Sequence, residues 1–460
     1  MAFYGARPAT TTAAVQQQPA AGATGAAGAQ GISYYNKAHS TLLPDGPRDS
    51  ISNLSWSNDG SLLSCTSWDN SVRIWQVCAG FGTQLQVFPK FCAETAAPLL
   101  CSSFGPASNH LFVGGCDKTA KLYDLLSGNT SPQVVAQHDQ PVCSVAWNPL
   151  QNVLVTASWD GFVRMWDGKQ QQPIWQQTVG GKIFLMGVHN PFLALCDNFR
   201  NVIVLNLSTL FHGSGQHQQP MLKMNPPLQK LQSRSMGFFP DKEQETPGLA
   251  VGGIEGRVGI CHFKPEHRQM NFSFKCHRQE TPQGIRIYAV NAVDFHSKHG
   301  TFATGVSCMQ RLLLPSRAIE CVSVQVAASL SRGGDDPHAC PVIHSYVCQA
   351  QDAPFADDSV KAKPKSNNFA LVLLIFQGAD GSITVWDKVN RQKLRSFDNM
   401  GSCVADVKFD PMGNNLLAYA LSYDWHKGPD QQEMAKGHQV YVHVMKEEDV
   451  RPRPKTATRR

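Results

Sequence analysis

The sequence predicts an all-β protein, a seven-bladed β-propeller in which small antiparallel sheets stack around a ring. The first observation behind this prediction is a unit of short strands, with an aspartate at a turn and an aromatic residue at a strand end, that recurs at least four times in 460 residues. The second is that 42% of the residues are hydrophobic and only 17% are charged, which is typical of proteins with many buried strands. Because stacked repeats form one closed object, we expect one folded domain despite the length.

Each clear copy of the repeat places an aspartate six residues before an aromatic residue. An aspartate suits a tight connection between two strands because its carboxylate accepts hydrogen bonds from nearby backbone N–H groups. Asp69, Asp117, Asp160 and Asp380 recur in step with the repeat, so we interpret them as turn-forming residues and not as catalytic carboxylates. The four copies are residues 67–75 (SWDNSVRIW), 115–123 (GCDKTAKLY), 158–166 (SWDGFVRMW) and 378–386 (GADGSITVW).

A partner strand precedes each clear copy, so each unit is a small antiparallel sheet. Such a sheet has two apolar faces that it cannot bury alone, which predicts that the units stack radially and close a ring. Weaker units bring the count to seven, with six and eight as open alternatives. The partner strands are residues 51–56, 99–104, 142–147 and 290–295, and the weaker units are residues 184–205, 234–263 and 403–444.

The two ends of the chain differ from the repeats in composition. Residues 1–48 contain a low-complexity stretch rich in alanine, glutamine, threonine and glycine, and we expect a disordered extension. Residues 446–460 are charged and contain proline, so we expect a basic flexible tail. The predicted propeller therefore spans residues 49–445.

A long insert, residues 306–377, interrupts the sixth blade between a strand and the turn that should follow it. Joining Gly305 to Gly378 restores the blade without a gap. Residues 306–307 can be encoded by a sequence that resembles the start of an intron, and residues 371–377 by a pyrimidine-rich tract that ends in CAG. We interpret the insert as a possible retained intron, with a genuine surface loop as the alternative. Sequencing the transcript across this junction distinguishes the two.

No motif for catalysis is visible, since the sequence has no phosphate-binding Gly-x4-Gly-Lys-Ser/Thr loop, no His-Glu-x2-His pair and no Gly-x-Ser-x-Gly turn. We therefore expect neither an enzyme nor a cofactor. The longest apolar run, residues 369–376, is far shorter than the roughly 20 residues that cross a bilayer, so we expect no membrane insertion.

The 14 cysteines include no Cys-x-x-Cys pair, and several lie in strand-like runs, which favours reduced, buried thiols. Within the insert, four residues loosely imitate the spacing of a metal site, but we expect no metal there. The thiols in strand-like runs include Cys65, Cys116, Cys143 and Cys261, and the four residues of the insert are His338, Cys340, His344 and Cys348.

Several longer strings are more specific than the repeat. Together they resemble the WD40 propellers of the Rae/Gle type, which act in messenger-RNA export at the nuclear pore, over roughly residues 49–444 without the insert. Mitotic-checkpoint propellers of the Bub type share two of the strings and are the nearest rival. The strings are residues 116–121 (CDKTAK), 137–142 (QHDQPV), 253–258 (GIEGRV), 271–278 (NFSFKCHR), 287–291 (IYAVN) and 422–428 (SYDWHKG).

The resemblance implies a non-enzymatic adaptor in export of poly(A) RNA, located in the nucleus and at the pore complex of the nuclear envelope, with shuttling to the cytoplasm. In that family the propeller binds an acidic nucleoporin hairpin, the GLEBS motif, and a neighbouring basic groove takes single-stranded RNA or ribonucleoprotein. Arginine and lysine suit phosphates or carboxylates, and aromatic faces suit bases. The groove positions that match are Arg257, Phe274, Lys275, Trp386, Asp387, Lys388 and Arg391.

Plainer interpretations of these groove positions stay open. Trp386 ends a blade strand and Phe274 lies in an apolar string, so both suit a structural role, while Lys388 and Arg391 suit a solvated surface. Two other functions also use this fold: a checkpoint adaptor that binds kinetochore or spindle proteins, and a substrate receptor of a ubiquitin ligase. RNA binding with a steep salt dependence favours the export function.

Overall fold

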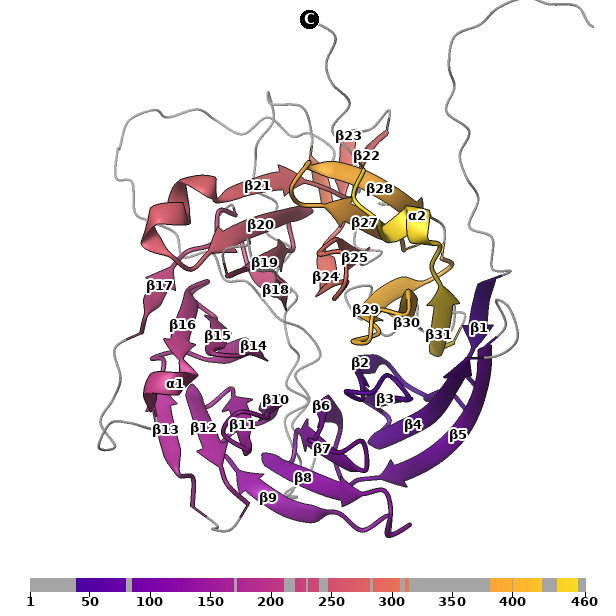
Figure 1. Ribbon diagram of the computed structural model, residues 1–460, viewed down its shortest axis with the longest axis vertical. Coiled ribbons are helices and arrows are strands. Elements are labelled where there is room, and N and C mark those ends of the chain that lie inside the picture. Colours follow the sequence, from indigo (N-terminus) through magenta and orange to yellow (C-terminus); the bar gives the residue numbers. More distant parts are fainter. Residues whose placement is uncertain are drawn as a thin grey trace, which may run out of the picture. The chain divides into compact units, whose positions relative to one another are not determined.

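Seven four-stranded antiparallel sheets form the blades of the propeller, and Figure 1 shows them following one another around a ring in chain order. The predicted all-β, seven-bladed fold is therefore confirmed. A smaller sheet of three strands is attached between the fifth and sixth blades. The structure is a computed structural model that describes residues 39–79, 85–168, 172–210, 220–228, 231–239, 247–281, 284–306, 311–313, 381–398, 400–423 and 437–453.

In the first six blades the strand that comes first in the sequence is innermost and the last is outermost. In the seventh blade the outermost strand comes from the N-terminal part of the chain. The first three blades comprise β2 (Ile51–Trp56), β3 (Leu62–Ser67), β4 (Ser71–Ala79) and β5 (Leu85–Glu94); β6 (Leu99–Phe104), β7 (His110–Gly115), β8 (Thr119–Asp124) and β9 (Gln133–Gln137); and β10 (Val142–Asn148), β11 (Val153–Ser158), β12 (Phe162–Trp166) and β13 (Trp175–Thr178).

The fourth and fifth blades, with their short helices, comprise β14 (Ile183–His189), β15 (Phe192–Asp197), β16 (Val202–Asn206), α1 (Leu207–Leu210) and β17 (Leu222–Met224); and β18 (Ser233–Phe238), β19 (Gly248–Gly253), β20 (Arg257–His262), η2 (Pro265–Met270) and β21 (Phe272–Lys275). The sixth and seventh comprise β24 (Val290–Phe295), β25 (Phe302–Val306), β27 (Ile383–Asp387) and β28 (Gln392–Phe397); and β29 (Cys403–Phe409), β30 (Leu416–Ser422), β31 (Gln439–Val444) and β1 (Ser40–Leu42).

The hydrophobic core is divided among the seams between blades. Seven clusters of buried residues each draw their members from two neighbouring blades. The cluster between the fifth and sixth blades, for example, contains Val258 and Ile260 from β20 together with Phe302 from β25. The innermost strands of neighbouring blades are in contact all the way around, including β29 with β2. The apolar faces that one sheet cannot bury alone are thus covered by the next sheet.

Strand β1 corrects the predicted start of the folded region. It pairs antiparallel with β31 as the outermost strand of the seventh blade, and Leu43 directly after it is buried. The C-terminal part of the chain supplies only three strands to this blade, so the N-terminal strand closes the ring. The propeller therefore begins at Ser40 and not at residue 49, and residues 1–38 lie outside the described residues.

The predicted flexible tail also needs correction. Residues Glu447–Val450 form the short helix α2, and Val450 is fully buried in the cluster between the sixth and seventh blades. The backbone carbonyl of Val450 accepts a hydrogen bond of 2.8 Å from the Thr301 hydroxyl. Burial of an apolar side chain stabilises the docked segment, so the tail packs on the propeller at least to Arg453.

The insert separates two strands that are neighbours in the sixth blade, since β25 pairs directly with β27. This pairing matches the continuity that the sequence predicted when the insert is removed. Of the insert, Arg311–Leu313 forms β26, a strand that the sequence did not predict. It pairs with β23 (Gly284–Ile287), which also pairs with β22 (Arg278–Thr281). Its remaining residues after Val306 lie outside the described part of the chain.

Candidate nucleic-acid interface

Three repeat aspartates, Asp69, Asp117 and Asp160, lie in the turns between the second and third strands of their blades. Asp69 and Asp117 accept hydrogen bonds of 3.1 Å from backbone N–H groups two residues further on, and Asp160 accepts one of 2.8 Å from Phe162. Burial alone would raise the pKa of Asp160, but hydrogen bonds from His138 and Phe162 lower it to about 2. Asp380 lies outside the described residues.

A hydrogen-bond network in the third blade ties such a turn to the strand that ends in tryptophan. His138 contacts Asp160 through Nδ1 at 2.9 Å and the Thr156 hydroxyl through Nε2 at 2.8 Å. The indole N–H of Trp166 donates to the same hydroxyl at 2.9 Å. Because these side chains lie in the blade interior, each satisfies the polar groups of the others.

Trp386 belongs to the equivalent network of the sixth blade. Its indole N–H donates to the Thr304 hydroxyl at 2.9 Å, and Nε2 of His277 contacts that hydroxyl at 2.6 Å. Nδ1 of His277 lies 3.3 Å from the Ser382 hydroxyl. Burial, with a smaller contribution from Lys393, lowers the pKa of His277 to about 3, so this imidazole is neutral. The polar atom of Trp386 is therefore used inside the blade, and only its ring is available to a ligand.

Phe274 on β21 meets Trp386 at the seam between the fifth and sixth blades. Their ring centroids are 5.0 Å apart, and both rings are half-buried against the hydrophobic cluster of this seam. Phe272, two residues earlier on the same strand, is 6.3 Å from Phe274. The two aromatic residues that the resemblance selects thus lie together, although their sequence positions are far apart.

Two cations lie over aromatic rings beside this pair. The ammonium of Lys388 is 4.3 Å from the ring centroid of Phe239, and the guanidinium of Arg391 is 4.1 Å from that of Phe272. Such contacts are worth about 0.5–1 kcal/mol at exposed sites and restrict where each charge can lie. We name Phe274, Trp386, Lys388 and Arg391 the basic strip.

Asp387 shapes the turn that carries the two cations. It is 2% exposed and accepts hydrogen bonds from the backbone N–H groups of Val389 and Asn390, at 2.9 and 3.1 Å. The side-chain amide of Asn390 donates to its other oxygen at 2.7 Å. Asp387 therefore acts on the interface by holding the turn, because its carboxylate is enclosed.

Arg257 and Lys275 face the other side of the fifth blade. They are cross-strand partners on β20 and β21, and a guanidinium nitrogen of Arg257 lies 3.5 Å from the Ser273 hydroxyl. Since side chains alternate along a strand, Ser273 and Lys275 point away from the face of Phe272 and Phe274. The structure brings the basic strip together and places these two cations across β21 from it.

Three residues beside the interface were not selected from the sequence. Phe239 and Phe272 support the two cations, and Arg278 donates to the backbone carbonyl of Glu255 at 3.0 Å. Burial, followed by the nearby charge of Arg257, lowers the pKa of Arg278. Phe272 and Arg278 belong to the string NFSFKCHR, which could have indicated them, whereas Phe239 stands in no recognisable motif.

The described ranges of the chain contain no cluster of three or more histidine, cysteine or acidic residues suited to a metal ion. No helix among them is long and apolar enough to span a bilayer. Cys65, Cys116 and Cys261 are buried and Cys143 is half-buried. The four histidine and cysteine residues of the insert lie outside these ranges.

Comparison with known proteins identifies the repeat and similar chains. The family described as "WD domain, G-beta repeat" matches residues 39–76, 84–124 and 129–167. Protein RAE1 of Arabidopsis thaliana is 31% identical over 429 residues, which cover 93% of this chain and 97% of that protein. The poly(A)+ RNA export protein of Schizosaccharomyces pombe is 27% identical over 412 residues, with 89% and 91% of the two chains covered.

A third relative, the mRNA export factor GLE2 of Chaetomium thermophilum, is 27% identical over 421 residues, with 90% and 92% of the chains covered. Among solved structures, U3-55K matches with a TM-score of 0.57 and the RRP9 WD40 repeats with 0.58, each at 12% identity. The matches cover 89% and 90% of this chain and all of those chains. At this identity the two structures support the propeller fold alone.

Proposed function

Because this chain belongs to the family of WD40 mRNA export proteins that includes Arabidopsis RAE1, we propose that it is a non-enzymatic adaptor in the export of poly(A) RNA from the nucleus. It docks on a nucleoporin that carries an acidic GLEBS hairpin, and it contacts RNA through its basic groove. Its location is the nucleus and the pore complex of the nuclear envelope, with shuttling to the cytoplasm. The family's propeller is a scaffold of a kind that is generally non-catalytic.

The basic strip is the observation that carries this proposal. Lys388 and Arg391 lie on aromatic supports that reduce the conformational freedom lost when a phosphate binds. The half-buried rings of Phe274 and Trp386 lie next to them and offer an apolar edge to a base. A site of fixed cations beside aromatic rings suits single-stranded RNA, whose backbone and bases it contacts at once.

Arg257 and Lys275 add to the groove from the second face of the blade. Lys275 lies on β21, the outermost strand of its sheet, so its long side chain can extend to the exposed edge beside the basic strip, and Arg257 is its cross-strand partner on β20. Lys275 is exposed, and the guanidinium of Arg257 can pair with a carboxylate in two parallel hydrogen bonds. We propose that these two residues bind the acidic nucleoporin hairpin.

The test compares binding of two ligands, poly(A) RNA and an acidic GLEBS hairpin peptide, to the full chain and its variants. Lys388→Glu/Arg391→Glu is expected to weaken RNA binding and to reduce the slope of log affinity against log salt by about 1.4, since each phosphate contact on a single strand contributes about 0.7. Arg257→Glu/Lys275→Glu is expected to weaken the peptide more than RNA. Fluorescence anisotropy over a salt series measures the RNA arm, and calorimetry measures the peptide arm.

Lys223→Glu is the matched control, because this lysine is exposed on β17, the outermost strand of the fourth blade. It should leave both affinities near those of the unchanged chain. Failure of the well-folded, unchanged chain to bind either ligand would refute the adaptor proposal. RNA binding without the expected loss in Lys388→Glu/Arg391→Glu would show that the RNA site lies elsewhere.

A further inference from the structure

The C-terminal segment after β31 lies along the outer edge of the sixth blade. Helix α2 leads into residues 451–453, where the Arg453 guanidinium donates to the Leu394 carbonyl of β28 at 3.1 Å. The side-chain amide of Asn390 donates to the Arg453 carbonyl at 2.9 Å. Because Val450 is buried and the Arg453 side chain is bonded to β28, the segment is held at two points, and we name residues 446–453 the C-terminal strap.

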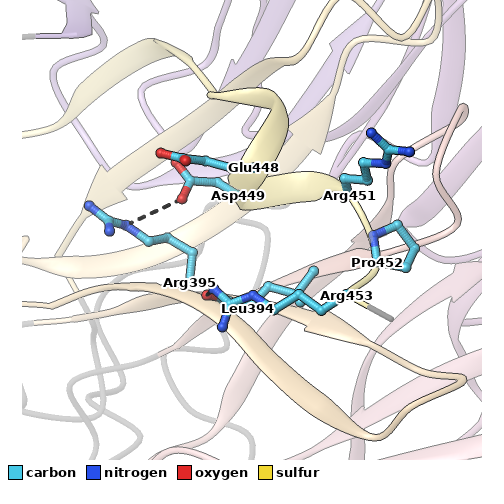
Figure 2. A pocket seen from close by; sticks show the side chains of 7 residues that line it. All are labelled: Leu394, Arg395, Glu448, Asp449, Arg451, Pro452 and Arg453. Atoms are coloured by element: carbon cyan, nitrogen blue, oxygen red, sulfur yellow. Dashed lines mark hydrogen bonds and ion pairs between the residues drawn. The ribbon is translucent and has the colours of Figure 1, made fainter. Parts of the chain in front are cut away.

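A pocket of about 890 Å³ opens between the strap and β28. This volume lies within the range of about 300–1,000 Å³ that is typical of ligand pockets. Figure 2 shows the two acidic residues on the same side as Arg395, with Arg451 projecting from the opposite side. The lining residues are Leu394, Arg395, Glu448, Asp449, Arg451, Pro452 and Arg453.

Unbalanced positive charge remains once the ion pairs of this pocket are counted. Arg395 approaches Asp449 at 3.7 Å, but its buried Nε has no hydrogen-bond partner. Glu448 lies 3.8 Å from Lys446. Within the described ranges, no ion pair is recorded for Arg451 or Arg453, and both residues are exposed. The Arg451 side of the pocket therefore presents cations that no neighbouring carboxylate neutralises.

The pocket adjoins the basic strip through one turn. Asn390, which holds the strap at Arg453, lies between Lys388 and Arg391 in the turn from β27 to β28 and is bonded there to Asp387. Arg391, Arg395 and the strap thus follow β28 on a single outer edge of the blade. An RNA strand that continues from the basic strip along β28 would therefore meet this pocket next.

We propose that this pocket is a second phosphate subsite for the same single-stranded RNA, with Arg451 and Arg453 as its ligands. The inference rests on the proposed RNA contact at the basic strip and extends it. A planar guanidinium matches the oxygens of a phosphate in a bidentate contact. RNA that spans both sites binds more tightly than RNA that fills only one.

The test is the single variant Arg451→Glu in the full chain, measured with a four-nucleotide and a twenty-nucleotide oligoadenylate. Because loss of one phosphate contact reduces affinity about fivefold at roughly 0.1 M salt, the longer RNA should bind at least about fivefold more weakly, with a salt slope lower by about 0.7. The shorter RNA, held at the basic strip, should be almost unaffected. The Arg451 guanidinium has no recorded partner among the described residues, so an unchanged melting temperature is expected.

Two controls separate this inference from the proposed function. Lys182→Glu, at an exposed position in another blade, should not alter binding of either RNA, and Arg451→Lys should keep the salt slope because it keeps the charge. If the unchanged chain binds both RNAs and Arg451→Glu leaves the longer one unaffected, the subsite is refuted while the basic strip stands. If neither RNA binds the unchanged chain, the RNA contact itself fails. Polyglutamate serves as an acidic peptide probe for the competing possibility. If Arg451→Glu loses polyglutamate binding but keeps RNA binding, the subsite is refuted in favour of a peptide pocket.

Discussion

The Thr156 hydroxyl shows how one side chain serves two functions in a blade. It receives the indole N–H of Trp166 and contacts Nε2 of His138, so two strands and the turn at Asp160 share one buried oxygen. The same arrangement recurs at Thr304, with His277 and Trp386. A residue that the resemblance assigns to RNA binding therefore also has a structural function, and replacing Trp386 would change both.

We predict that Thr156→Val destabilises the protein by about 1–3 kcal/mol, because it leaves the buried nitrogens of His138 and Trp166 without a partner while preserving shape. The midpoint of urea unfolding measures the loss. Ser127→Ala is the control, since its hydroxyl bonds the Asp124 carbonyl at an exposed site and should shift the midpoint little. Equal shifts for the two variants would contradict the network's importance.

At the scale of elements, the ends of the chain determine the closure of the ring. β1 gives the seventh blade its outermost strand, and the Pro44 carbonyl just after it accepts a 2.7 Å hydrogen bond from the Trp75 indole of the first blade. The strand is only three residues long, yet it connects the first and last blades. It contributes through its position, because it covers the edge of β31, which would otherwise expose unpaired backbone N–H and C=O groups.

Deleting residues 1–43 is predicted to lower the melting temperature and to speed proteolysis within the seventh blade, because the edge of β31 and the site of buried Leu43 are then uncovered. The chain that lacks residues 1–38 is the matched control, since it keeps β1 whole. Differential scanning fluorimetry and timed trypsin digestion measure the two effects. Identical melting of both truncations would mean that β1 contributes nothing to closure.

At the scale of the whole molecule, side chains of the innermost strands link blade to blade. Asp294 on β24 accepts the backbone N–H of Phe409 on β29 at 2.7 Å, and Asp406 on β29 accepts that of Leu54 on β2 at 2.9 Å. Lys408 lies 4.0 Å from Asp294. Burial raises the pKa of both carboxyl groups, to about 6 for Asp294, although the charge of Lys408 opposes this rise.

These shifts predict that stability depends on pH. Asp294 binds its proton more tightly in the folded protein, where its pKa is about 6, than at its ordinary value of 3.8. Its contribution is fully present below pH 3.8 and is lost as pH rises through about 6, on the order of 3 kcal/mol. Urea midpoints between pH 4 and 7 measure this loss. Asp294→Asn keeps an acceptor for Phe409 but cannot titrate, so an unchanged pH profile in this variant would contradict the assignment.

Much of the fold could be predicted from the sequence because the propeller repeats one local unit. The strands at residues 51–56, 99–104 and 290–295 stand where alternation and turn residues indicated. The basic strip could be predicted only through the resemblance, since Phe274 comes from β21 and the other members from β27 and the β27–β28 turn, which are distant from β21 in sequence. Phe239 could not be predicted because no local pattern relates it to Lys388.

By itself, the sequence determined the blades: periodicity and turn chemistry act over a few residues and are readable one unit at a time. Only the tertiary structure decided how the ends are used, because β1 pairs with β31 and Val450 enters a core that neither segment's composition reveals. It also decided that Arg257 and Lys275 face away from Phe272 and Phe274, since strand register selects the face on which a side chain lies. Contacts between distant segments depend on register and packing, which no local pattern specifies.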